Sequence, residues 1–180
     1  AFLARFATDW TCGLLWNKLY KRALFDGIFF EEGHKIDDEY FTYQGVMNAA
    51  KVVCDPRVVY NYRQRASSVM QSPAAKAQIA IDRIDFMAKR REKVLERFPE
   101  LRREFDISFV DALSYLADYP DNTEESIRLL KYYARRYFLQ RGNTFPPRHL
   151  LKAVFFMYVT STEKVLKRPQ AKKPAPEDYY

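Results

Sequence analysis

The sequence has 180 residues, of which 48% are hydrophobic and 16% aromatic, and its formal net charge is +7. This composition excludes a globally disordered chain, and the length allows one ordinary domain or a small domain with an appendage. The positive charge suits an anionic partner, such as a nucleotide, a lipid head group or nucleic acid, without choosing among them. The longest apolar run, residues 153–159, is far too short to span a bilayer.

The two cysteines, Cys12 and Cys54, have no CxxC spacing and no histidine nearby. We therefore expect no structural metal site and interpret both as buried free thiols, which fits a protein of the reducing cytoplasm. The chain carries no secretory signal and begins without Met, which indicates a trimmed start.

The first elements in chain order are predicted to be short. Residues 1–15 are expected to form a helix or an irregular lead-in, and residues 16–20 a short strand. A short helix is expected over residues 22–25, with Gly27 placed to end it.

A longer helix follows, and after it two strands. The helix is predicted over residues 37–50, because the acidic residues 37–39 would face its free N-terminal N–H groups. β-rich runs over residues 51–54 and 58–62 predict two strands, with a turn at residues 55–57 between them.

From about residue 71 the hydrophobic pattern is that of helices. Apolar residues at helical spacing, with Pro and capping signals at the starts, predict four helices. These cover residues 74–98, residues 101–116, a stretch from Asn122 to a break at residues 141–143, and residues 147–167. The chain therefore divides into a mixed part of residues 1–70, a helical appendage of residues 71–168, and a tail of residues 169–180 that we expect to be disordered.

Three polar clusters stand at the ends of short apolar runs, where a rigid scaffold commonly holds reactive groups. They are WNKLYKR at residues 16–22, FEEGHKIDDEYF at residues 30–41 and YNYRQRASS at residues 60–68. In this order and spacing they resemble the C-terminal half of the catalytic domain of family-2 glycosyltransferases with the GT-A fold, of the bacterial surface-polysaccharide type. The resemblance covers residues 10–70 and departs from the family at Asp37, where the family usually has Glu.

The resemblance implies a fold that is α+β to mostly α, with a partial GT-A α/β half up to about residue 70 and an α-helical C-terminal region. It also implies an enzyme that transfers a sugar from a nucleotide-sugar donor to a saccharide or lipid-linked acceptor. Such an enzyme is expected in the cytoplasm, where it could lie at the inner face of the membrane. The family's Asp-x-Asp motif and a Gly-rich phosphate loop are absent from the sequence. We therefore expect a C-terminal fragment that is inactive alone, while the full-length enzyme would use Mg²⁺ or Mn²⁺.

The resemblance assigns Asp38 as the catalytic base that takes the proton of the acceptor hydroxyl. Because adjacent carboxylates repel each other, one member of the Asp37–Asp38 pair would have a raised pKa if both point into one cleft. The alternative, which the residues alone favour, is that both carboxylates only cap a helix.

Arg63 and Arg65 would project from the same face of a strand, where two guanidinium groups could hold a diphosphate. The alternative is a solvated edge strand that carries basic residues. Trp16 could pack in the core or serve as a sugar-stacking platform. The remaining residues assigned to substrate binding are Asn17, Lys18, Asp37, Tyr62 and Ser68.

A rival interpretation makes the chain a basic helical interaction module that binds nucleic acid or an anionic membrane. Its support is the basic pairs and triplets at residues 89–91, 102–103, 135–136 and 167–168. No nucleic-acid-binding signature accompanies them, so nucleic acid is the less expected of the two partners. The basic end of the last helix predicts peripheral contact with an anionic membrane, with a core helix as the alternative. His34, in a predicted loop just before the acidic pair, could contact substrate, but we interpret it as an incidental, exposed loop residue.

Overall fold

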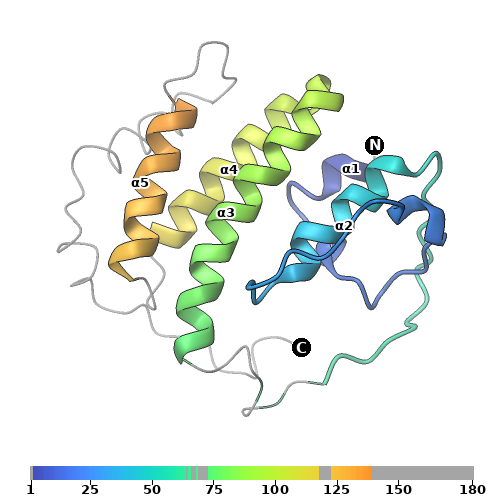
Figure 1. Ribbon diagram of the computed structural model, residues 1–180. Coiled ribbons are helices and arrows are strands. Elements are labelled where there is room, and N and C mark those ends of the chain that lie inside the picture. The colour runs from blue at the N-terminus through green and yellow to red at the C-terminus, as the bar shows by residue number, and fades with distance from the viewer. Residues whose placement is uncertain (1, 64, 66–67, 69–72, 118–122, 139–180) are drawn as a thin grey trace.

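The computed structural model describes residues 2–63, 65, 68, 73–117 and 123–138 (Figure 1). Three helices form one side of the molecule: α3 (Pro73–Arg97), α4 (Arg102–Ala117) and α5 (Glu124–Phe138). All three pack against one another, and a 3-10 turn, η4 (Pro99–Leu101), joins α3 to α4. The three helices were predicted because their apolar spacing and their Pro residues are local signals.

The core of this helical part is built from one apolar stripe on each helix. Its fully buried members include Ile84 from α3, Phe109 and Leu113 from α4, and Leu130 from α5. Small residues such as Ala80 lie in the same cluster and let the helices approach closely. Ile84 and Leu130 are among the apolar residues whose helical spacing in the sequence predicts α3 and α5.

The sequence predicts a capping pair of Asn122 and Glu125 for α5, whereas the pair in the structure lies one residue later, at Thr123 and Ser126. The Ser126 backbone N–H donates to the Thr123 hydroxyl at 3.2 Å, and the Thr123 N–H donates to the Ser126 hydroxyl at 2.9 Å. This is the reciprocal geometry of a capping box, with Ser in the place of Glu. The predicted cap residue Asn122, the turn before it, the fourth helix and the tail lie outside the described residues.

The first part of the chain packs on the other side of α3 (Figure 1). It contains α1 (Phe2–Arg5), η1 (Trp10–Gly13), η2 (Arg22–Phe25) and α2 (Asp37–Asn48). The predictions of a helix from residue 37 and of a short helix at residues 22–25 are confirmed. Gly27, with a φ of 76°, supplies the left-handed turn that was expected to end the latter.

Residues from both sides of position 70 share the same apolar core. Leu3, Phe6 and Tyr43 of the first part form one buried cluster with Val94 of α3 and Phe105 of α4. The first part is therefore held to the helices by a common core rather than by surface contacts alone.

The expectation of a partial GT-A α/β half before residue 70 is wrong, because no strand occurs among the described residues. Residues 51–63 run extended but wholly exposed, and they make no backbone–backbone hydrogen bond to another described residue. A strand requires a neighbour that pairs with its backbone groups, so β-rich composition alone does not form one. The predicted strand over residues 16–20 is also wrong, since that segment is an irregular turn.

The prediction for the thiols is half right. Cys12 is buried in the core, as expected, and burial raises the pKa of its thiol. Cys54 is exposed on the extended segment, so the expectation that it is buried is wrong.

Candidate functional site

The loop after η1 is organised by the side chain of Lys18. Its ammonium group donates to the Thr11 carbonyl at 3.0 Å, the Leu14 carbonyl at 2.6 Å and Asn17 Oδ1 at 2.6 Å. The Asn17 amide also donates to the Thr11 carbonyl, at 3.2 Å. All three ammonium protons of Lys18 are thus engaged, and burial lowers its pKa. In this structure Asn17 and Lys18 shape the loop, and their assignment to substrate binding stays a prediction.

Asp38 lies in the first turn of α2, beside this loop. Burial, and then repulsion from Asp37, raise the pKa of the Asp38 carboxyl, whereas the N–H of Glu39, donating to Asp38 Oδ1 at 3.1 Å, opposes the shift. The Asp37 carboxylate accepts the Asp38 N–H, also at 3.1 Å. Both carboxylates therefore accept backbone N–H groups of the first turn, as the capping interpretation expects, although the Glu39 N–H also donates to the Ile36 carbonyl at 3.1 Å. The raised pKa of Asp38 suits a base.

η1 packs against α2, and the side chains of the loop that follows η1 are electrostatically coupled to the start of that helix. The negative charge of Asp38 raises the pKa of Lys18, against the effect of burial. The pKa of Tyr20 is raised to about 12, chiefly by burial, with a further contribution from Asp38. The Asp38 carboxyl thus affects the ionisation of both an ammonium group and a phenol.

Trp16 is 37% exposed and lies outside the core. Its ring stacks on Tyr62, with centroids 5.1 Å apart and planes at 7°, and on Tyr60, with centroids 4.4 Å apart and planes at 32°. This contact joins the third polar motif, residues 60–68, to the first, residues 16–22. Arg63 and Arg65 follow on exposed chain, and the half-buried Ser68 donates its N–H to the Arg65 carbonyl at 3.1 Å.

The structure therefore gathers two pairs of predicted site residues. Trp16 and Tyr62 are in direct contact, and Lys18 and Asp38 are electrostatically coupled. Arg63 and Arg65 make no ion pair with any residue that the structure describes. They are free to meet an anion, as a diphosphate-binding pair would be.

A second polar cluster connects the loop before α2 to α3. His34 Nδ1 lies 3.1 Å from Asp82 Oδ1, and Asp82 Oδ2 accepts the Lys35 N–H at 2.6 Å. The Tyr40 hydroxyl donates to Asp85 at 2.8 Å, and Lys89 lies 3.1 Å from the same carboxylate. The interpretation of His34 as an exposed, incidental residue is wrong.

Part of this second cluster has a local signal in the sequence. Asp82, Asp85 and Lys89 fall three and four residues apart and so share one face of α3. His34 and Tyr40 lie more than 40 positions before Asp82 in the sequence, so no local pattern connects them to this face of α3. Since its carboxylates are all bonded to groups of the protein, the cluster serves to fix the first part on α3.

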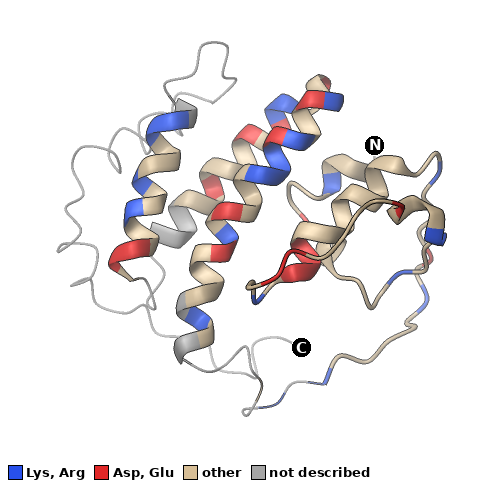
Figure 2. Cartoon of the chain, in the orientation of Figure 1, with Lys and Arg blue, Asp and Glu red and all other residues tan. Residues whose placement is uncertain are grey.

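The basic residues of α3 do not form a continuous basic face. Arg90 and Arg91 are buried, the former 3.3 Å from Glu39 and the latter bonded to Asp106. Lys89 lies 2.7 Å from Glu31. Figure 2 shows acidic and basic residues following one another along this helix. This arrangement gives the rival interpretation, a basic interaction module, no support from α3.

Comparisons with protein-family models, with curated proteins and with solved structures found no match. The described residues contain no group of three or more His, Cys, Asp or Glu side chains that could hold a metal ion. They therefore do not fit the divalent cation that the resemblance implies. None of the helices in the described part is long and apolar enough to cross a membrane.

Proposed function

We propose that this chain supplies the acceptor side of a glycosyltransferase site, at which a sugar passes from a nucleotide-sugar donor to a hydroxyl group of a saccharide or lipid-linked acceptor. The observation that carries the proposal is the gathering of the three polar motifs. Trp16 stacks on Tyr62, and Lys18 of the same loop is coupled to Asp38. The motif resemblance supplies the reaction class, and the geometry supports it by bringing residues from three separate segments together.

In this proposal each group has a separate task. Asp38 takes the proton of the attacking hydroxyl, for which its raised pKa is suitable. Arg63 and Arg65 hold the departing diphosphate through their guanidinium groups. Any Mg²⁺ or Mn²⁺ would need ligands beyond the described residues, so no step is assigned to it. A place in the cytoplasm, at the inner face of the membrane, would suit a lipid-linked acceptor.

Replacement of Asp38 in the natural full-length protein tests the proposal. Asp38→Asn should reduce kcat for transfer by about 10²–10⁴-fold and leave donor binding intact, because only the base is lost. The matched control is Asp37→Asn, which removes the same charge from the neighbouring, exposed position. Near-normal kcat in Asp38→Asn, together with a large loss in Asp37→Asn, would show that the base is the other carboxylate. Near-normal kcat in both variants would show that neither carboxylate is the catalytic base.

A further inference from the structure

Residues 51–63 form an extended segment, here called the strap, that runs along the outside of the molecule (Figure 1). Every residue of the strap is exposed. Its internal ordering is limited to Asp55, which accepts the Arg57 N–H at 3.0 Å and pairs with the Arg57 guanidinium. A segment with neither buried side chains nor backbone pairing is placed only by the contacts at its ends.

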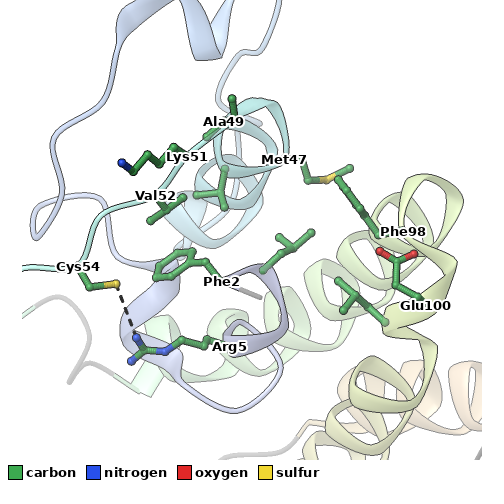
Figure 3. Close-up of a pocket in the computed structure, with 13 residues that line it drawn as sticks. Phe2, Arg5, Met47, Ala49, Lys51, Val52, Cys54, Phe98 and Glu100 are labelled. Carbon is green, nitrogen blue, oxygen red and sulfur yellow. Dashed lines mark hydrogen bonds between the residues drawn. The ribbon is translucent and has the colours of Figure 1, made fainter.

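The start of the strap lies against a groove of about 600 Å³. Figure 3 shows Val52 and Cys54 on one side of this groove, with Phe2 and Arg5 of α1 close by. The Arg5 guanidinium lies 3.8 Å from Cys54 Sγ, which is a weak contact. This end follows directly from α2, so its position is fixed by the helix.

The far end of the strap is held by aromatic stacking. Tyr60 and Tyr62 lie two positions apart, so on extended chain they face the same side, and both stack on Trp16. Trp16 is in turn carried by the loop that Lys18 ties to η1. Among the described residues these stacks are the contacts that tie residues 58–63 to the body of the protein.

From this arrangement we infer that Trp16 is a clamp that holds the strap and thereby positions Arg63, the residue that follows Tyr62. In this role Trp16 is a positioning residue rather than a substrate contact, because the strap tyrosines Tyr60 and Tyr62 stack on its ring. The task of Arg63 rests on the proposed function. The experiment on the clamp needs no ligand. The clamp and the proposed function can therefore be disproved independently of each other.

A nitroxide spin label on the strap of the 180-residue chain tests the clamp. The label is attached through Val59→Cys, in a chain with Cys54→Ser, because Val59 is exposed and faces away from Tyr60. Its electron paramagnetic resonance spectrum reports nanosecond motion of the strap. Trp16→Ala should raise the ratio of mobile to immobile signal by about threefold to tenfold, as expected for the loss of one or two aromatic pairs. Trp16→Phe, which retains a ring, should restore most of the immobile signal.

Two further variants separate a clamp from a general effect on folding. Trp10→Ala removes the other exposed tryptophan and should leave the spectrum unchanged. Tyr60→Ala with Tyr62→Ala removes the same stack from the strap side and should reproduce the effect of Trp16→Ala. An unchanged spectrum in Trp16→Ala would overturn the inference. So would a rise in Trp16→Ala that the double tyrosine variant does not share, because Trp16 would then act through the body of the protein.

Discussion

Arg90 and Arg91 of α3 lie inside the protein, each paired with a carboxylate of another helix. Arg90 meets Glu39 of α2 at 3.3 Å, and Arg91 Nε donates to Asp106 of α4 at 2.7 Å. Burial lowers the pKa of Arg90, and the charge of Glu39 opposes that shift. Removing one partner of such a pair leaves an uncompensated buried charge, which costs much more than the loss of a surface pair.

We predict that Asp106→Asn lowers the free energy of unfolding by about 3–5 kcal/mol, because the Arg91 guanidinium would stay buried without its counter-charge. Urea unfolding followed by circular dichroism measures the change. Glu104→Gln is the matched control, since it removes one charge from an exposed position of the same helix. It should cost less than about 1 kcal/mol. Equal losses in the two variants would contradict the role given to the buried pair.

A second prediction at this scale concerns the acidic pair at the start of α2. Asp37→Asn should lower the pKa of Asp38, because it removes the repulsion that adds to burial in raising that pKa. Carboxyl ¹³C chemical shifts followed during an acid titration measure this pKa directly. Asp111→Asn, which removes one charge from an exposed position of α4, is the control. If the Asp38 pKa stays the same after Asp37→Asn, the two carboxylates are not electrostatically coupled.

At the scale of single elements, the helices follow from local sequence and the extended segments do not. The cap of α5 and the acidic first turn of α2 act over three or four residues, so a sequence pattern predicts them. A strand over residues 58–62 needs a neighbour that pairs with its backbone groups, and β-rich composition alone does not show that one is present. The exposure of Trp16 likewise depends on Tyr60 and Tyr62, more than 40 positions away. The site residues could be nominated from the motifs, but their contacts could not.

The capping pair of α5 yields a prediction at this scale. Thr123→Ala removes the hydroxyl that accepts the Ser126 N–H and should destabilise the protein by about 0.5–2 kcal/mol. Thr123→Ser keeps an oxygen at the same position and should stay close to the native stability. Thermal unfolding of the three proteins under identical conditions measures the difference. An alanine variant as stable as the serine variant would show that the cap contributes nothing.

At the scale of the whole molecule, the first part and the helical part are joined by a shared core. Tyr43 lies in the cluster that contains Phe6 of the first part and Val94 of α3. Burial raises the pKa of Tyr43 to about 12. The free energy of unfolding should therefore fall at alkaline pH, because the unfolded chain can ionise this phenol there and the folded chain cannot.

The sign follows from proton linkage. An unfolded tyrosine loses its proton near pH 10, whereas folded Tyr43 keeps it up to about pH 12, so the unfolded state binds fewer protons in this window. Stability is fully present below about pH 10 and falls by about 1.4 kcal/mol per pH unit above it. Tyr43→Phe should remove that share of the slope, as measured by urea unfolding between pH 9 and pH 11.5. Identical slopes in the two proteins would place Tyr43 outside the shared core.

The most direct test of the proposed site is a ¹H–¹⁵N NMR titration of the 180-residue chain with inorganic pyrophosphate, which represents the diphosphate of any nucleotide-sugar donor. We predict that the signals which shift belong to the Arg63 and Arg65 side chains, the Trp16 indole N–H and the backbone of Asp38. These four residues come from the three gathered motifs. No shift at all, or shifts confined to the basic residues of α3, α4 and α5, would contradict a diphosphate site at this place.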